Sequence, residues 1–369
     1  MALSWYRIEN VGNLDSPALV VYPDRIRKNI STLIGSVSDV TRLRPHVKTH
    51  KSEEVTRLML DAGISKFKCA TIAEAEMLAQ AGALDVLLAY QPVGPKGYRL
   101  EKLMRKYPKV KWSCLIDDLE CAKDLSYVFE KSKAQINVYV DLNVGMNRTG
   151  IAPQDAFGLI DDCTRLSGVS IIGLHAYDGH LRDPDFDTRK KKCDETFENV
   201  KRVADEVKKK FGKEMIIVAG GTPTFSIHRK RKGVECSPGT YIYWDKGYED
   251  VLQEQHYLHA ALVITRVISV PARNTICVDL GHKSIASENP IDRRVHFLNA
   301  PELQPVGHSE EHLVLKTTSE KKYRIGDVLY GIPYHICPTV ALYDVCHAVA
   351  DERVGEKWIT AARKRKITV

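Results

Sequence analysis

The feature that most constrains the fold is a regular alternation of short apolar runs with amphipathic segments, which extends from about residue 18 to residue 245. The apolar runs are rich in branched side chains, as buried strands are, and the segments between them repeat apolar residues with the period of a helix. This pattern is typical of repeated βα units around a parallel sheet. The chain has 369 residues, of which 44% are hydrophobic, so it can bury a full core.

Eight candidate strands lie in this region, which is the number that closes a (β/α)8 barrel of the TIM type. They are Leu19–Tyr22, Leu43–Thr49, Lys66–Thr71, Asp85–Tyr90, Trp112–Asp117, Ile136–Leu142, Ser170–Tyr177 and Met215–Gly220. Helices are expected between them at Asp24–Ser36, Glu53–Ala62, Ile72–Ala81, Lys96–Lys106, Leu119–Lys131, Gln154–Leu166 and Asp187–Phe211. The sequence therefore predicts an α/β barrel over residues 18–245.

Beyond residue 245 the pattern changes to apolar runs separated by turn-rich segments, without convincing helices. Examples are Leu262–Val270, Thr275–Leu280, Arg294–Asn299 and His312–Lys316. We therefore expect a second, all-β domain over residues 246–369, joined by residues 1–17.

Charge and cysteine content argue against several classes of protein. The net charge of +7 comes from 54 Lys and Arg against 47 Asp and Glu, and no basic run is interleaved with aromatic residues that stack on bases, so no nucleic-acid partner is expected. No apolar run reaches the length of a membrane span, and the first residues lack a secretory pattern. Nine cysteines form no CxxC pair, which favours a reduced, cytoplasmic protein.

The chemistry of such a barrel lies where its strands end. Four motifs occupy those positions: "RPHVKTHK", "DLNVGMNRTG", "HAYDGH" and "AGGTPT". In an extended strand, Arg44, His46, Lys48 and His50 of the first motif would share one face. Positive neighbours and partial burial lower the pKa of an ammonium group, so Lys48 is expected to be a nucleophilic amine that can form a Schiff base. The alternative is a salt-bridged strand lysine.

The glycine motif after the last strand could cradle an anion. The backbone amides of Gly220, Gly221 and Thr222 suit a phosphate group, although the motif matches no nucleotide fingerprint and is also compatible with a plain glycine turn. Arg148 could be a fixed cation for a phenolate or a carboxylate, or a salt bridge at the barrel rim.

The "HAYDGH" motif offers an aromatic ring and groups that move protons. Tyr177 could contact a planar cofactor, and a histidine could act near neutral pH. His175 or His180 alone is equally compatible with a structural role, and Asp178 lies between them in the sequence.

In the β domain, "YGIPYHICPTVALYD" places His335 and Cys337 two residues apart. In an extended segment their side chains would point the same way. Imidazole and thiolate suit zinc, and two protein ligands leave open positions of the kind that a catalytic metal needs.

Taken together, "RPHVKTHK", "GMNRTG", "HAYDGH", "GGTPTF", "SPGTYIYWD" and "PYHICPTV", in this order along almost the whole chain, resemble the D-threonine aldolase and D-serine dehydratase family of fold-type III enzymes, which depend on pyridoxal 5'-phosphate. The resemblance implies an alanine racemase-like barrel that binds the cofactor, a C-terminal β domain and a homodimer.

The resemblance also implies roles for particular residues. Lys48 looks like the lysine that bonds to the cofactor, and His180 is the best candidate for the residue that takes the proton of a β-hydroxyl group, with His175 and Asp178 as alternatives. The remaining roles are cofactor contacts for Arg148 and Tyr177, phosphate contacts for Gly221, Thr222 and Tyr241, and divalent-metal ligands, for Mn²⁺ or Zn²⁺, for His335 and Cys337.

The implied substrate is a small β-hydroxy-D-amino acid. The wording of "DLGHKSIASENP" looks closer to D-threonine aldolases, so we expect a carbon–carbon lyase that yields glycine and an aldehyde. The first alternative is a dehydratase of the D-serine or D-threo-3-hydroxyaspartate type, which yields a 2-oxo acid and ammonia. A second alternative is a non-catalytic protein that binds pyridoxal phosphate, which would need Lys48 and the glycine motif but not the metal pair.

Overall fold

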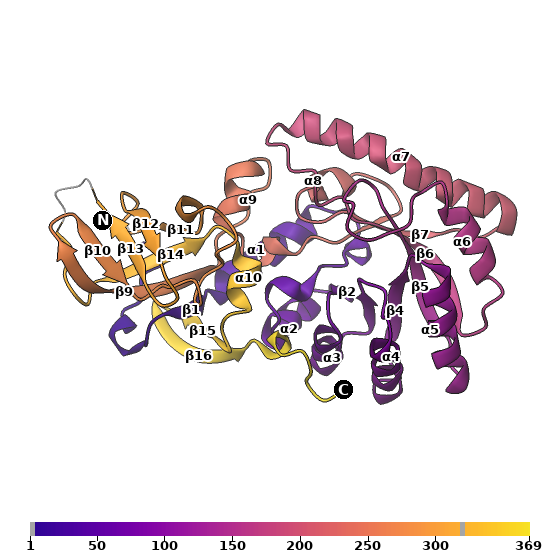
Figure 1. Cartoon of the computed structure of the whole chain (residues 1–369), viewed down its shortest axis with the longest axis horizontal. Coiled ribbons are helices and arrows are strands. Elements are labelled where there is room, and N and C mark those ends of the chain that lie inside the picture. Colours follow the sequence, from indigo (N-terminus) through magenta and orange to yellow (C-terminus); the bar gives the residue numbers. More distant parts are fainter. Residues whose placement is uncertain (1–3, 318–321) are drawn as a thin grey trace. The chain divides into compact units, whose positions relative to one another are not determined.

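The computed structural model describes residues 4–317 and 322–369 and divides the chain into two compact units, each with its own sheet (Figure 1). The barrel unit contains Leu33–Lys48, Val55–Gly239 and Lys364–Val369, and the β unit contains Thr49–Glu54, Thr240–Arg363 and the segment before Leu33. Residues 1–3 and 318–321, which belong to the expected β domain, lie outside the described residues. The boundary expected between residues 245 and 246 stays a prediction.

The barrel unit is built on a parallel sheet whose strands follow one another in sequence order. These strands are β2 (Lys66–Cys69), β3 (Asp85–Leu88), β4 (Lys111–Ile116), β5 (Ile136–Leu142), β6 (Val169–Ala176), β7 (Ile216–Ala219) and β8 (Val234–Cys236). Isolated parallel bridges join Leu43 to Cys236 on β8 and His46 to Lys68 on β2. Residues 43–46 therefore occupy the eighth position, and the expected parallel barrel is confirmed.

Two of the expected barrel strands are wrong. The run Leu19–Tyr22 forms β1 (Ala18–Val21), which pairs with β9 (Ala261–Ala272) and β15 (Val345–Ala350) in the other sheet. Because β1 is buried on both faces, its composition fits either sheet equally well. The barrel uses the short β8 instead, which contains a glutamate and shows no apolar run.

The basic segment is the second correction. It is extended only as far as the bridge at His46, and Val47–Thr49 forms a 3-10 turn, η3. The predicted alternation of Arg44, His46, Lys48 and His50 on one strand face is therefore wrong beyond His46.

Helices agree better with the sequence, because capping residues and helical periodicity are local signals. The expected segments correspond to α1 (Pro23–Gly35), α2 (Glu53–Asp61), α3 (Ile72–Ala81), α4 (Pro95–Lys106), α5 (Leu119–Lys131), α6 (Ala156–Cys163) and α7 (Phe186–Phe211). Thr71 caps α3 by accepting a hydrogen bond of 3.0 Å from the Glu74 amide, and Gly82 ends it with a φ of 100°. None of the helices in the described part of the chain is long and apolar enough to cross a membrane.

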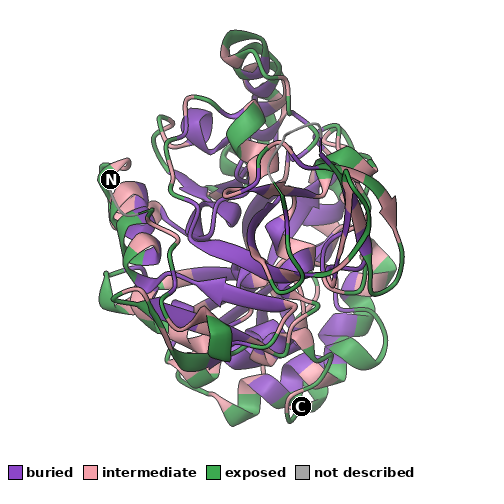
Figure 2. Cartoon of the chain, turned by 90° about the vertical axis from the view of Figure 1, so that its left-hand side faces the viewer, coloured by how far each residue is buried: buried purple, intermediate pink, exposed green. Residues whose placement is uncertain are grey.

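The sheet of the β unit is mostly antiparallel. Besides β1, β9 and β15 it contains β10 (Thr275–Val278), β11 (Val295–Phe297), β12 (Gln304–His308), β13 (Leu313–Lys316), β14 (Val328–Pro333) and β16 (Arg353–Ile359). Its strands bury one core cluster that includes Val20, Leu262, Ile264 and Ile332; Figure 2 shows buried residues along the strands and exposed ones on outer helices and loops. The unit also contains the short helices α9 (Lys246–Val251) and α10 (Ile336–Val340), which the sequence pattern did not indicate, beside the expected sheet.

A buried cation holds the closing segment of the barrel. The guanidinium of Arg44, which is 1% exposed, donates to Glu235 on β8 at 2.7 Å and to Asp85 on β3 at 2.6 Å. Burial alone would lower the pKa of Arg44, but the two carboxylates outweigh it and raise that pKa. Lys66 also bonds to Glu235, so β2, β3, β8 and the closing segment meet in one network of charges.

Replacing Arg44 with methionine would leave the carboxylates of Asp85 and Glu235 in the protein interior without this cation. Breaking a buried ion pair costs about 3–5 kcal/mol, so we expect Arg44→Met to lower the free energy of unfolding by that amount in chemical denaturation. Lys111→Ala is the matched control, because this half-exposed lysine lies 3.8 Å from Asp85 and its loss should cost at most about 1 kcal/mol. An Arg44→Met protein as stable as the wild type would contradict this account.

Candidate functional site

Tyr177, directly after β6, is the centre of the residues that the barrel unit brings together. The guanidinium carbon of Arg148 lies 5.0 Å from the ring centroid, and the Nζ of Lys68 lies 5.6 Å from it. A Cβ atom at Gly221 would lie 2.8 Å from Cε2 of Tyr177, so the ring rests against a residue that must lack a side chain. The structure thus places the predicted contacts Arg148, Tyr177 and Gly221 beside one another.

The loop after β7 contains the residues of the predicted anion cradle. Gly220 has a φ of +74°, and the residues from Gly220 to Thr224 are buried. The hydroxyl of Thr222 accepts a hydrogen bond of 3.1 Å from the amide of Gly239. Just after β8, the buried hydroxyl of Ser237 has no hydrogen-bond partner among the described residues, as expected of a group that awaits a ligand. The two hydroxyl groups have the chemistry of phosphate contacts, whereas the amide of Gly220 already donates to the carbonyl of Ala176 at 2.9 Å.

Lys48 lies in η3 and is partly buried. Its expected positive neighbours act differently from the prediction. Arg44 is neutralised by two carboxylates, and burial lowers the pKa of His50 to about 3, which leaves that histidine neutral. The cation that interacts with Lys48 is Lys68, since burial and then the charge of Lys48 lower the pKa of Lys68 to about 7.

Two of the three candidate bases already have buried partners. The Nδ1 of His175 lies 2.6 Å from Oδ1 of Asp141, and its Nε2 lies 3.3 Å from the Nζ of Lys68. Asp178 accepts a hydrogen bond from Thr224 at 2.6 Å and is also paired with a histidine.

His180 is the exposed candidate. Its Nε2 lies 2.9 Å from where a Cβ of Gly145 would be, so the ring packs directly on the loop that carries Arg148. Exposure is what a residue that meets a substrate requires, so His180 stays the predicted base.

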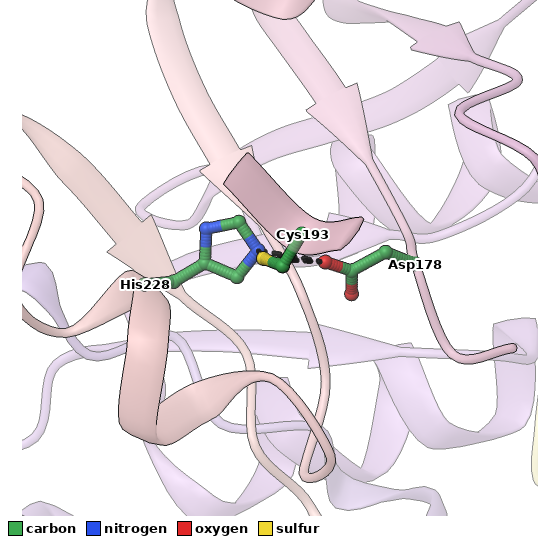
Figure 3. Close-up of side chains that lie close together, drawn as sticks. All are labelled: Asp178, Cys193 and His228. Carbon is green, nitrogen blue, oxygen red and sulfur yellow. Dashed lines mark hydrogen bonds and ion pairs between the residues drawn. The ribbon is translucent and has the colours of Figure 1, made fainter. Parts of the chain in front are cut away.

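Asp178, Cys193 and His228 form a buried cluster that sequence reasoning missed (Figure 3). Nε2 of His228 lies 2.8 Å from Asp178, and Sγ of Cys193 lies 3.4 Å from that nitrogen. The ligand types suit a metal ion. However, Arg231 donates to Nδ1 of His228 at 3.2 Å and to Sγ of Cys193 at 3.5 Å, and burial with Asp178 raises the pKa of the thiol to about 12. A guanidinium and a protonated thiol disfavour a cation, so the cluster is better suited to tying the Tyr177 loop to α8 (Phe225–His228) and α7.

In the β unit, His335 is the N-cap residue of α10 and Cys337 lies in its first turn, so the expectation of an extended segment is wrong. The two side chains nevertheless interact. His335 also bonds through Nδ1 to Glu288, and the thiol of Cys337 lies 3.1 Å from the Thr49 hydroxyl. Imidazole, thiol and a neighbouring carboxylate are ligands of the kind that zinc binds, which leaves the metal site a prediction.

Tyr241, the last predicted contact, lies in the β unit within the 3-10 turn Thr240–Ile242 (η4). It is 1% exposed, and its ring centroid is 5.7 Å from that of Tyr257. Its part in a phosphate site stays a prediction.

Sequence reasoning missed Lys68, Asp141 and Ser237. A lysine inside the apolar run "KFKCATIA" was the available signal, because a charge in a buried parallel strand needs a specific partner. Asp141 and His175 lie on different strands, so no local sequence pattern predicts that they form a pair.

Comparison with known proteins agrees with this geometry. The family model described as alanine racemase, N-terminal domain, matches residues 21–246, and that of a serine dehydratase domain matches residues 260–349. A D-threonine aldolase of Arthrobacter sp is 26% identical over 365 residues, which cover 96% of this chain and 94% of that protein. A D-threo-3-hydroxyaspartate dehydratase of Delftia sp. (strain HT23) is 23% identical and covers 94% and 97%.

A solved structure shows the same fold. The D-threonine aldolase from Filomicrobium marinum superimposes with a TM-score of 0.87 and 27% identity, over 98% of this chain and 99% of that one. The alanine racemase-like fold that the sequence motifs imply is therefore confirmed. The chain belongs to the alanine racemase N-terminal domain family and, with its second domain, to the pyridoxal-phosphate-dependent lyases that include D-threonine aldolases and D-serine dehydratases.

Proposed function

We propose that this protein is a D-threonine aldolase-type lyase, which uses pyridoxal phosphate and a divalent metal ion to cleave small β-hydroxy-D-amino acids into glycine and an aldehyde. The observation that carries the proposal is that Arg148 and Gly221 both lie against the ring of Tyr177, at the strand ends of the barrel unit. The aldolases among the relatives support the choice of reaction.

The residues of the barrel unit fit the cofactor by their chemistry. When bound, pyridoxal phosphate supplies an electron-withdrawing ring that makes a bond at Cα breakable. Lys48 would hold its aldehyde carbon, and the amides of Gly221 and Thr222 would donate to its phosphate. Arg148 would place a fixed cation near its phenolic oxygen.

His335 and Cys337 are the proposed ligands of the divalent ion. A metal ion there would polarise the β-hydroxyl group of the substrate, and His180 would take the hydroxyl proton. A thiolate ligand favours Zn²⁺ over the harder Mn²⁺. The predicted homodimer and the cytoplasmic location belong to the same proposal.

Dehydration is the second candidate, and the match of residues 260–349 to a serine dehydratase domain favours it. In this case Lys48 would remove the proton from Cα and hydroxide would leave from Cβ. Water would then hydrolyse the released enamine to a 2-oxo acid and ammonia. Nearly the same residues serve both reactions, so the products must decide between them.

The first test is a product assay with the cofactor-loaded protein, D-threonine, and either Zn²⁺ or Mn²⁺. We expect glycine and acetaldehyde. The formation of 2-oxobutyrate and ammonia would instead establish a dehydratase, and no turnover of any β-hydroxy-D-amino acid would favour the non-catalytic alternative. Lys48→Ala should lose both turnover and the visible absorbance of lysine-bound cofactor, whereas Lys102→Ala, which removes an exposed lysine of the same unit, should keep both.

Replacing Gly221 with alanine tests whether this residue lines the cofactor site. Gly221→Ala must displace the Tyr177 ring, so we expect the affinity for pyridoxal phosphate to fall about tenfold, equivalent to about 1.4 kcal/mol. The control is Gly158→Ala, at an exposed position of α6 with open space around it, which should leave the affinity unchanged. Equal affinities in equilibrium dialysis would show that Gly221 does not line the cofactor site.

Replacing both proposed metal ligands distinguishes the role of the metal ion from that of the cofactor. We expect the double variant His335→Ala and Cys337→Ala to lose bound divalent ion in elemental analysis and to turn over D-threonine about a hundredfold more slowly, equivalent to about 2.7 kcal/mol. It should still bind pyridoxal phosphate. The exposed His256 offers a control through His256→Ala. Full activity of the double variant in the presence of a chelator would reject the site.

A further inference from the structure

Asp178 is a buried acidic residue next to Tyr177, in the loop that follows β6. Its residue is 3% exposed, and Figure 3 shows its carboxylate directed toward His228. The carbonyl of Asp178 accepts a hydrogen bond of 3.0 Å from the amide of Leu181, which closes the turn that contains His180. An ionised group in the protein interior is costly unless it is hydrogen-bonded, so the partners of Asp178 should explain its presence.

Both oxygens of this carboxylate have donors. Oδ1 accepts a hydrogen bond of 2.6 Å from the hydroxyl of Thr224, and Oδ2 lies 2.8 Å from Nε2 of His228. Because Arg231 donates to Nδ1 of His228 at 3.2 Å, the proton of the ring lies on Nε2 and is donated to Asp178. Burial would raise the pKa of Asp178, but His228 and then Thr224 outweigh it and lower that pKa, so Asp178 is ionised. We call Asp178, Thr224, His228 and Arg231 the Asp178 network.

The hydroxyl of Thr224 serves this network rather than its own helix. Thr224 is the N-cap residue of α8, a position at which a threonine hydroxyl usually accepts a hydrogen bond from an amide of the first turn. The hydroxyl makes no such bond here and donates to Asp178 instead. It therefore joins the loop after β6 to the loop after β7.

The Asp178 network also lies directly against the backbone of Gly220. A Cβ atom at Gly220 would be 2.6 Å from Cδ2 of His228 and 2.8 Å from the hydroxyl oxygen of Thr224. On its other side, the amide of Gly220 donates to the carbonyl of Ala176 at the end of β6. Gly220 is thus held from two sides, and the next two residues of the loop are the predicted phosphate contacts.

We propose that Asp178, Thr224 and His228 are positioning residues that hold the loop after β7 in the conformation that binds the phosphate of pyridoxal phosphate. This inference rests on the proposed cofactor. None of the three side chains touches the cofactor, and Asp178 does not take the proton of the substrate, because both of its oxygens already accept hydrogen bonds.

The test compares two ligands of the full-length protein freed of cofactor: pyridoxal phosphate, and pyridoxal, which lacks the phosphate. Their affinities are measured by equilibrium dialysis. Thr224→Val keeps the shape of the side chain but removes the hydroxyl, which leaves an oxygen of Asp178 without its donor. We expect the affinity for pyridoxal phosphate to fall about tenfold and that for pyridoxal to stay unchanged, since only the phosphate contacts the loop. Thr224→Ser, which keeps the hydroxyl, should bind both ligands like the wild type.

A double variant tests whether Asp178 and Thr224 act together. Asp178→Asn exchanges an accepting oxygen for a donor and should show the same selective loss of affinity for pyridoxal phosphate. Adding Thr224→Val to it should cause little further loss, because both changes remove the same hydrogen bond. Additive losses would show that the two residues act independently. If Asp178→Asn does not fold, His228→Leu replaces it and should show the same selective loss.

Thr164→Val is the matched control, because it removes an exposed hydroxyl at the end of α6 that bonds only to the carbonyl of Asp161. Both affinities should be unchanged. An equal loss of both affinities in Thr224→Val, or no loss of either, would overturn the role of the Asp178 network in phosphate binding. A wild-type protein that binds neither ligand would overturn the proposed function as well.

Discussion

The barrel depends on the buried guanidinium of Arg44. The segment that carries it is too short to form a regular strand, and it is joined to its neighbours by isolated bridges and by the carboxylates of Asp85 and Glu235. Ion pairs of this kind are directional and resist any other placement of the segment. The position of Lys48 follows from this, because it lies four residues further along the same segment.

At the strand ends, glycine residues leave space that the rings of neighbouring side chains occupy. Gly221 and Gly179 leave space that the Tyr177 ring fills, and Gly145 does the same for His180. Around this ring the barrel places the cations Arg148 and Lys68. Such an arrangement would suit an anionic, planar cofactor.

Much of the fold was predictable because the signals are local. Helical periodicity and caps such as Thr71 predicted the long helices. The motifs that follow the expected strands indicated Lys48, Arg148, Tyr177 and Gly221 as candidate site residues. The errors in assigning strands to sheets have one physical cause. The apolar β1 is compatible with either sheet, and β8 is too short for periodicity to detect, so only long-range pairing decides where each lies.

The sequence by itself determined the fold class and the family, and it predicted the residues most suited to cofactor chemistry, since these follow from periodicity and from motifs within single loops. Only the tertiary structure decided which of the basic side chains carry a charge that no neighbour compensates. It neutralised Arg44, left His50 neutral by burial, and brought Lys68, His175 and Asp141 together from three different strands. The physical reason is that burial and ion pairing are properties of neighbours in space, and these neighbours lie far apart along the chain.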